Sequence, residues 1–200
     1  MANAAVITAD IVNSTLLEKA QEKKLYQQLE TAMAAFKWEF YRGDSFQVYV
    51  KDPADALHLM LKLRMEARQY GTGFDIRASV GIGDVGGQVR KLSVSTGEAF
   101  ILSGRGMDEL GKLSGSRLLL RSNDGKINGT LEVIALFTDY IFRELTGKQA
   151  RVLSLLLDGS TQVAAAKKIR KSQSTVNKHV QSAGWEELSK LLAIYRQLFK

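Results

Sequence analysis

The first part of the chain alternates between short apolar runs, which suit strands, and apolar residues at helical spacing. The opening run, Ala4 to Ala9, is apolar almost throughout, as expected of a buried central strand. Polar residues follow it, and then an amphipathic helix that reaches about Lys37. The pattern next predicts strand, strand, helix, strand, helix and strand, at 38–41, 46–50, 52–70, 74–82, 95–105 and 116–120.

This order of elements, β-α-β-β-α-β with one more helix and strand, predicts an α+β fold class. It is the order of the ferredoxin-like, split βαβ arrangement, in which an antiparallel sheet carries its helices mainly on one face. Residues 122–130 are rich in Ser, Asn, Asp and Gly, so we expect a first domain at 1–125 and a second at 130–200. A helical stripe in 131–144 predicts a helix that packs the second domain onto the first.

The second domain is predicted to be all-α. Thr146 can cap a helix over 147–157, which Gly159 can end in a left-handed conformation. A second short helix over 162–168 leads to a turn at Arg170 and Lys171, and Ser172 can cap a third helix that reaches about residue 183. A final amphipathic helix covers 185–199. Two short helices joined by a tight turn predict a helix-turn-helix, which reads DNA in the major groove.

The outer face of the third predicted helix carries the side chains that DNA recognition requires. Amides bind adenine and lysine binds guanine in the major groove, while Lys and Arg also bind phosphates of any sequence. A small helical bundle with a solvated polar face is the alternative interpretation. The residues expected to contact DNA are Lys167, Arg170, Lys171, Ser172, Gln173, Ser174, Asn177, Lys178 and Gln181.

The net charge of +7 is concentrated in the second domain. Residues 1–138 hold 17 Lys and Arg against 16 Asp and Glu, whereas residues 139–200 hold 11 against 5. Attraction to phosphates requires such an excess. The chain has no cysteine, which excludes disulfides and cysteine-based zinc sites. Its first residues lack the pattern of a signal peptide and no run is long enough to span a membrane, so we expect a cytoplasmic protein without membrane contact.

Two carboxylates of the first domain are candidate metal ligands. Asp10 follows the first strand and Asp44 lies in the tight turn between the next two, so the predicted sheet brings both to one edge. Paired aspartates hold Mg²⁺ against substrate phosphates. Backbone N–H groups of Asn13, Ser14 and Thr15, at the expected helix start, would bind a phosphate. The alternative is a capping role for Asp10 and a turn role for Asp44.

Four motifs of the first domain resemble those of class III nucleotide cyclase domains, and they occur in the same order. They are ADIVNST at 9–15, RGDSF at 42–46, ASVGIGDV at 78–85 and STGEAFILSGR at 95–105. The resemblance implies that Asp10 and Asp44 bind a metal, Mg²⁺ with a nucleotide, and that Arg105 supports the transition state.

Three positions depart from the cyclase pattern. Phe40 and Val94 stand where the family has its base-selecting lysine and that lysine's partner aspartate, and Ile101 stands where it has an asparagine. Loss of the hydrogen bonds that select the base removes discrimination that nothing else supplies. The departures therefore favour a cyclase-like domain without cyclase activity.

The second domain resembles the DNA-reading modules of sigma factors and bacterial response regulators. Leu145-Thr146, Gly159 and the Ser-x-x-Thr-Val run at 172–176 match their pattern, whereas Arg170 and Lys171 replace a usual glycine and apolar residue. The whole chain resembles SatD-type bacterial proteins. We therefore expect a homodimeric, DNA-binding transcriptional regulator whose first domain senses a small ligand or dimerises. The alternative is a metal-dependent phosphoryl- or nucleotidyl-transfer enzyme that uses the two aspartates.

Overall fold

The computed structural model describes residues 3–200 and contains one five-stranded sheet. The strands lie in the order β2-β3-β1-β4-β5, with β1 antiparallel to both β3 and β4, and β5 parallel to β4. The first four strands thus have the split βαβ topology that the sequence predicts. The strands are β1 (Ala4–Val12), β2 (Lys37–Arg42), β3 (Ser45–Val50), β4 (Asp75–Gly83) and β5 (Leu118–Ser122).

Helices cover both faces of this sheet. The apolar faces of α1 (Lys19–Met33) and α2 (Ala56–Arg68) pack on the face that carries Val80 and Phe46. The third helix, α3 (Glu98–Leu110), lies on the opposite face, where Gly81 leaves room for the helix backbone. A Cβ on Gly81 would lie 2.2 Å from the carbonyl oxygen of Ala99, so only glycine permits this close approach. The expectation of helices mainly on one face therefore holds for α1 and α2 but not for α3.

The start of α1 differs from the sequence prediction. Asn13 adopts a left-handed conformation, with φ 59°, and leads into a short 3-10 turn at Ser14–Leu16. The α-helix begins only at Lys19, because Glu18 and Gln21 form a capping box there. The prediction that the long helix starts at Asn13, Ser14 and Thr15 is therefore wrong, and β1 runs past Asp10 to Val12.

Five helices complete the chain: α4 (Gly125–Glu144), α5 (Gly147–Leu157), α6 (Gln162–Ile169), α7 (Gln173–Ser182) and α8 (Trp185–Gln197). Their bounds agree closely with the prediction, and Thr146 and Ser172 cap α5 and α7 as expected. The start of α4 differs from the prediction, because the residues after Ser122, which are of types that favour loops, form the first helical turns of α4. Asp124 makes this possible by capping α4, its carboxylate accepting the backbone N–H of Lys126 at 3.0 Å.

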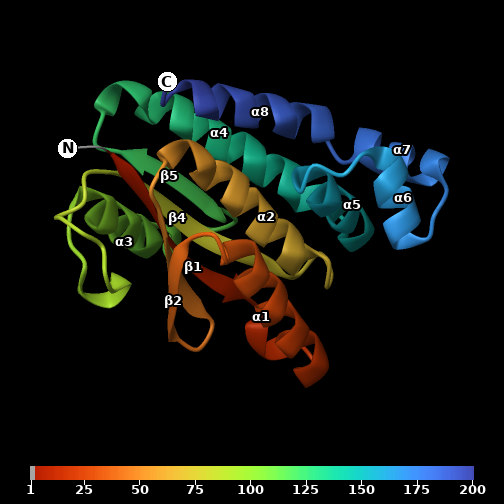
Figure 1. Cartoon of the computed structure of the whole chain (residues 1–200), viewed down its shortest axis with the longest axis horizontal. Coiled ribbons are helices and arrows are strands. Elements are labelled where there is room, and N and C mark those ends of the chain that lie inside the picture. The colour runs from red at the N-terminus through yellow and green to blue at the C-terminus, as the bar shows by residue number, and fades with distance from the viewer. Residues whose placement is uncertain (1–2) are drawn as a thin grey trace.

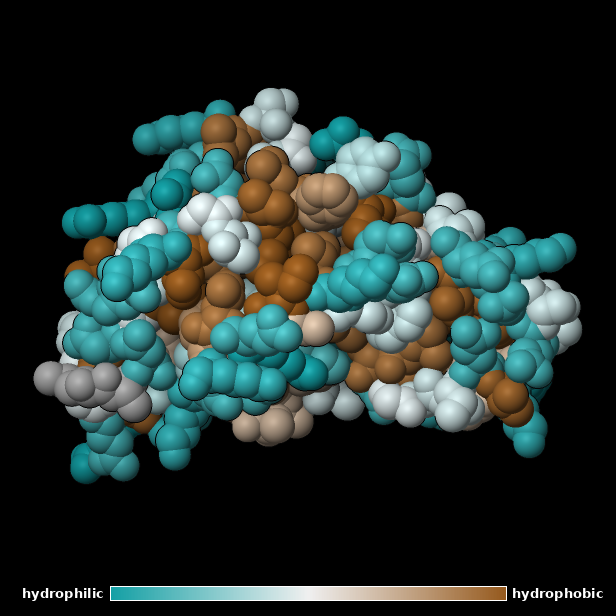
Figure 2. All heavy atoms as spheres, turned by 90° about the horizontal axis from the view of Figure 1, so that it is seen from above, coloured by the Kyte–Doolittle hydropathy of each residue, from teal (hydrophilic) through white to brown (hydrophobic). Residues whose placement is uncertain are grey.

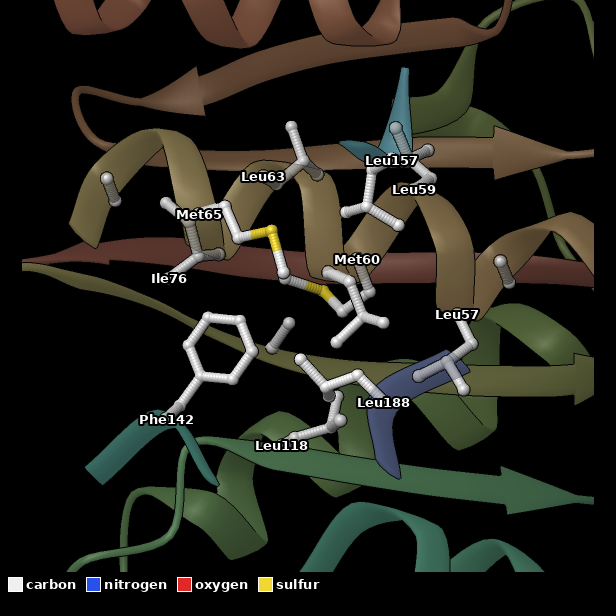
Figure 3. Packing of buried hydrophobic residues seen from close by; sticks show 14 of the residues in the cluster. Leu57, Leu59, Met60, Leu63, Met65, Ile76, Leu118, Phe142, Leu157 and Leu188 are labelled. Atoms are coloured by element: carbon white, nitrogen blue, oxygen red, sulfur yellow. The ribbon is translucent and has the colours of Figure 1, made fainter. Parts of the chain in front are cut away.

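The second helix of the sheet layer, α2, is buried along almost its whole length, and only His58 and Lys62 are partly exposed. It lies between the sheet and the C-terminal helices α5 and α8 (Figure 1). Phe142 of α4, Leu157 of α5 and Leu188 of α8 all gather around it (Figure 3). At the far end, the buried Tyr195 hydroxyl of α8 donates to the Pro53 carbonyl at 3.0 Å. One apolar core thus runs from the sheet into the C-terminal helices, and the division into two domains stays a prediction.

No helix within residues 3–200 combines the length and the apolar character needed to cross a membrane.

Candidate functional site

The exposed surface of α6 and α7 is the first candidate site, and its shape follows from the turn between the two helices. Arg170 ends α6 in a left-handed conformation with φ 55°. The next N–H, from Lys171, bonds back to the Ala166 carbonyl at 3.0 Å, as in a Schellman motif. The Ser172 side chain then accepts the Thr175 N–H at 3.2 Å and starts α7. Val176 and Val180 hold α7 against its neighbours, which turns its polar face outward.

All the residues predicted to contact DNA lie on this outward surface. Within residues 3–200, the side chains of Gln173, Asn177, Lys178 and Gln181 make no hydrogen bond to the protein. Ser172 differs, because its hydroxyl is engaged in capping. The structure therefore brings together the whole predicted set, with every member exposed: Lys167, Arg170, Lys171, Ser172, Gln173, Ser174, Asn177, Lys178 and Gln181.

Arg170→Gly is expected to raise the free energy of unfolding by about 0.5–1 kcal/mol, because a left-handed conformation strains any residue with a Cβ. The gain should come with weaker DNA binding if Arg170 contacts a phosphate. Urea denaturation measures the first effect. Lys171→Gly is the matched control, since Lys171 does not have a positive φ and should only lose stability. A loss of stability for Arg170→Gly would contradict the expectation.

The second candidate site is the pair of aspartates, which the sheet does bring close together. Asp10 pairs with Ser45 across β1 and β3, directly beside Asp44. Arg77 of β4 lies opposite Asp10 and binds its carboxylate through two hydrogen bonds, of 3.2 Å from Nε and 2.5 Å from the terminal nitrogen. The Asp44 carboxylate accepts the Ser14 hydroxyl at 2.6 Å. The pairing with Arg77 was not foreseen from the sequence.

The Arg77 guanidinium thus binds both carboxylate oxygens of Asp10. The hydrogen bonds that Arg77 donates to Asp10 raise the pKa of Arg77, and the charges of Asp10 and Asp44 add to this against the opposing effect of burial. Tyr41, nearby, has its pKa raised by burial and by Asp10. Within residues 3–200, no group of three or more His, Cys, Asp or Glu side chains could hold a metal ion. As they lie, Asp10 is held by Arg77 and Asp44 by Ser14, and metal binding by the two carboxylates stays a prediction.

The predicted phosphate-binding residues are not assembled into a site. Asn13 donates its side-chain amide to the Gly73 carbonyl at 2.7 Å, and the 3-10 turn after it spans only three residues. Ser14 is turned toward Asp44, whereas Thr15 faces solvent. Arg105 is exposed on α3 and bonds to neither aspartate. The expected α-helix start at Asn13 is therefore wrong, and phosphate binding by these residues stays a prediction.

The three positions that depart from the cyclase pattern carry apolar side chains that either pack on other aromatic rings or lie at the surface. Phe40 points to the α1 side of the sheet, away from Asp10, and its ring lies 5.1 Å from that of Tyr26 and 5.3 Å from that of Phe46. Val94 and Ile101 are exposed, at 72% and 50%. None of the three offers a hydrogen bond to a base.

A polar cleft between the sheet layer and the C-terminal helices is a third feature, which sequence reasoning missed. It encloses about 1170 Å³ between α1, α2, α5 and the end of α8. On its floor the buried Glu66 accepts from Gln28 at 2.7 Å and from Ser154 of α5 at 2.5 Å. Lys62 bridges α2 to α5 by bonding Asp158 at 2.6 Å. Only the packing of α5 on α2 creates this cleft, so no local pattern could have revealed it.

The cleft is lined by charged side chains of both signs: Lys24, Lys62, Arg151 and Arg196 against Asp55, Glu66 and Asp158. Lys24, Arg151 and Arg196 line it and form no ion pair within residues 3–200. Burial and the charge of Arg196 lower the pKa of His58, which lies among them. The lining therefore offers a small polar ligand both positive and negative groups.

Comparison with known proteins gives a limited result. No protein-family model and no curated protein sequence matches the chain. Among the solved structures that are similar to the chain are two that are each described as a bacterial light-regulated adenylyl cyclase. The first is 16% identical with a TM-score of 0.41, covering 60% of this chain and 75% of that one. The second is 14% identical with a TM-score of 0.43, covering 59% of this chain and 42% of that one.

Proposed function

We propose that the protein is a DNA-binding transcriptional regulator and that α7 reads the bases. The observation that carries this proposal is the polar face of α7, on which amide and lysine side chains protrude without a partner among the described residues 3–200. An amide such as that of Asn177 is matched to the edge of adenine, and a lysine such as Lys178 to that of guanine. A helix face that is only solvated, as in a simple helical bundle, does not require amide and lysine side chains at these positions.

The distribution of charge supports the same proposal. Lys167, Arg170 and Lys171 are exposed around the turn that leads into α7. In this position they would bind the phosphates that flank the groove and so fix the orientation of α7. No acidic residue lies between Gly159 and Gly184. The surface that faces DNA is therefore uniformly basic or neutral.

We further propose that the cleft between α1, α2 and α5 is the input of the regulator. A ligand bound there would touch both the sheet layer and α5, the helix that leads into α6 and α7. Through the hydrogen bond between Ser154 and Glu66, a shift of α5 would be coupled to the occupancy of the cleft. Such coupling requires that α5 has two positions, before and after the shift, and that the ligand binds them with different affinity.

Selection of bound fragments from random and genomic DNA tests the function directly. We expect enrichment of a defined sequence, with an affinity that falls steeply as salt rises because phosphates are neutralised. Fluorescence anisotropy at two salt concentrations measures that fall. Absence of DNA binding at about 50 mM salt would reject the proposal.

The enzyme alternative requires Asp10 to leave Arg77. We expect the wild-type protein to show no saturable Mn²⁺ binding by calorimetry up to about 1 mM, and Arg77→Ala to gain it, because both oxygens of Asp10 are then released. Arg77→Ala combined with Asp44→Asn is the control that should lose binding again. Submillimolar Mn²⁺ binding by the wild type that is abolished by Asp44→Asn would instead favour a metal-dependent phosphoryl-transfer enzyme.

A further inference from the structure

The outer face of α4 carries an apolar stripe that nothing in residues 3–200 covers. Val133, Leu136, Phe137 and Tyr140 follow the i, i+3, i+4, i+7 spacing of one helix face and are 51–66% exposed. Figure 2 looks onto the side of the molecule formed by α4 and α8, and apolar side chains gather across its middle. Monomeric proteins rarely leave so many large apolar side chains together at the surface.

The inner face of the same helix is already occupied. Leu131, Ile134, Thr138 and Phe142 are at most 1% exposed. On this side α4 packs on β5, and the Phe142 ring meets Arg64 of α2. The outer stripe is therefore additional to what the fold of the chain needs. Phe137 and Tyr140 stack edge to face, with ring centroids 6.3 Å apart, so the stripe has a defined shape.

The stripe is complementary in side-chain size and in charge to a second copy of itself that runs in the opposite direction. The N-terminal end has the small residues Gly129 and Thr130, and the C-terminal end has the large Tyr140. A Cβ on Gly129 would meet nothing within 4 Å, so nothing in the chain requires a glycine there. The exposed Lys126 precedes the stripe, and the exposed Glu144 ends it.

We propose that α4 pairs with α4 of a second copy of this chain, antiparallel and with the helix midpoints aligned. This arrangement puts Lys126 opposite the Glu144 of the other copy, Thr130 opposite its Tyr140 and Val133 opposite its Phe137. Small residues then face large ones and opposite charges meet at both ends. A two-fold axis makes such an interface self-complementary and closed. One helix pair forms a small interface, so we expect a dissociation constant in about the micromolar range.

The first test is the oligomeric state, measured by analytical ultracentrifugation without DNA, so that its outcome is independent of DNA binding. We expect a concentration-dependent dimer that Phe137→Glu weakens by about tenfold or more, because a charge is buried at the centre of the interface. Val94→Glu is the matched control, since Val94 is an exposed apolar residue on another surface. A monomer at all concentrations, or a dimer lost with Val94→Glu and kept with Phe137→Glu, would overturn the proposal.

The second test fixes the direction of pairing, and it uses the absence of cysteine in the chain. Leu136→Cys lies near the expected two-fold axis and should form a disulfide with its copy under mild oxidation. Glu144→Cys should not, because antiparallel pairing separates the two copies of residue 144 by about 27 Å along the helix axis. Rapid cross-linking of Glu144→Cys would show a parallel pair and refute the antiparallel one.

Discussion

Replacing Asp75 with alanine is expected to lower the free energy of unfolding by about 3–5 kcal/mol, because two buried guanidinium groups then lose their main partner. The Asp75 carboxylate accepts from Arg64 at 2.9 and 2.8 Å and from Arg68 at 2.8 Å. Arg64 is 1% exposed, Arg68 5% and Asp75 2%, so water cannot replace the lost bonds. Burial lowers the pKa of Arg64, but the charges and hydrogen bonds of Asp75 and Asp139 outweigh it, and the guanidinium stays charged.

The loss should reach beyond α2 and β4, because the same network holds α4 in place. Asp139 of α4 binds Arg64 at 2.7 Å and also accepts the backbone N–H groups of Arg117 and Leu118 at the start of β5. The Arg64 guanidinium lies over the Phe142 ring of α4, 4.1 Å from its centroid. Urea denaturation followed by circular dichroism measures the change. Glu109→Ala is the control, since it removes a half-exposed ion pair with Arg121 and should cost less than about 1 kcal/mol. Equal effects of the two substitutions would contradict this account.

Most of the fold could be predicted from the sequence because its signals are local. Strand alternation and helical spacing are properties of neighbouring residues, and Thr146 and Ser172 cap helices within three residues of themselves. The start of α4 could not be predicted, because turn-forming residues enter a helix there under the cap of Asp124 and the packing of α4 on β5. The nearly complete burial of α2 was also not foreseen. The outer side of α2 is polar. It is covered by α5 only because Lys62 of α2 donates a hydrogen bond to Ser154 of α5.

The two candidate sites were predictable to different degrees for a similar reason. The exposed face of α7 follows from helical periodicity once Val176 and Val180 are placed inside. The meeting of Asp10 and Asp44 follows from a tight turn between neighbouring strands. Arg77, in contrast, comes opposite Asp10 only through the register of β1 and β4, which are far apart in the sequence. Register between distant strands has no local signal, and here it decides what the aspartates bind.

Asn177→Ala and Lys171→Ala are expected to weaken DNA binding in two distinguishable ways. Asn177 lies on the outer face of α7, and loss of its bidentate bond to adenine should cost about 1–3 kcal/mol on the selected sequence and little on unrelated DNA. Lys171 precedes α7, and loss of its charge should weaken binding to all sequences similarly. It should also reduce the slope of log affinity against log salt by about 1. Fluorescence anisotropy with both DNAs, across a salt series, measures all of these quantities.

Lys190→Ala completes this comparison as a control for the loss of a positive charge. Lys190 is an exposed residue of α8, paired with Glu186 at 2.7 Å, and lies outside the predicted contact surface. Its substitution should leave both affinity and salt slope close to those of the wild type. If Lys190→Ala and Lys171→Ala had the same effect, the basic charge of the C-terminal helices would act only through net attraction. If Asn177→Ala weakened binding to every sequence equally, α7 would not be reading bases, because only a base contact makes the loss depend on sequence.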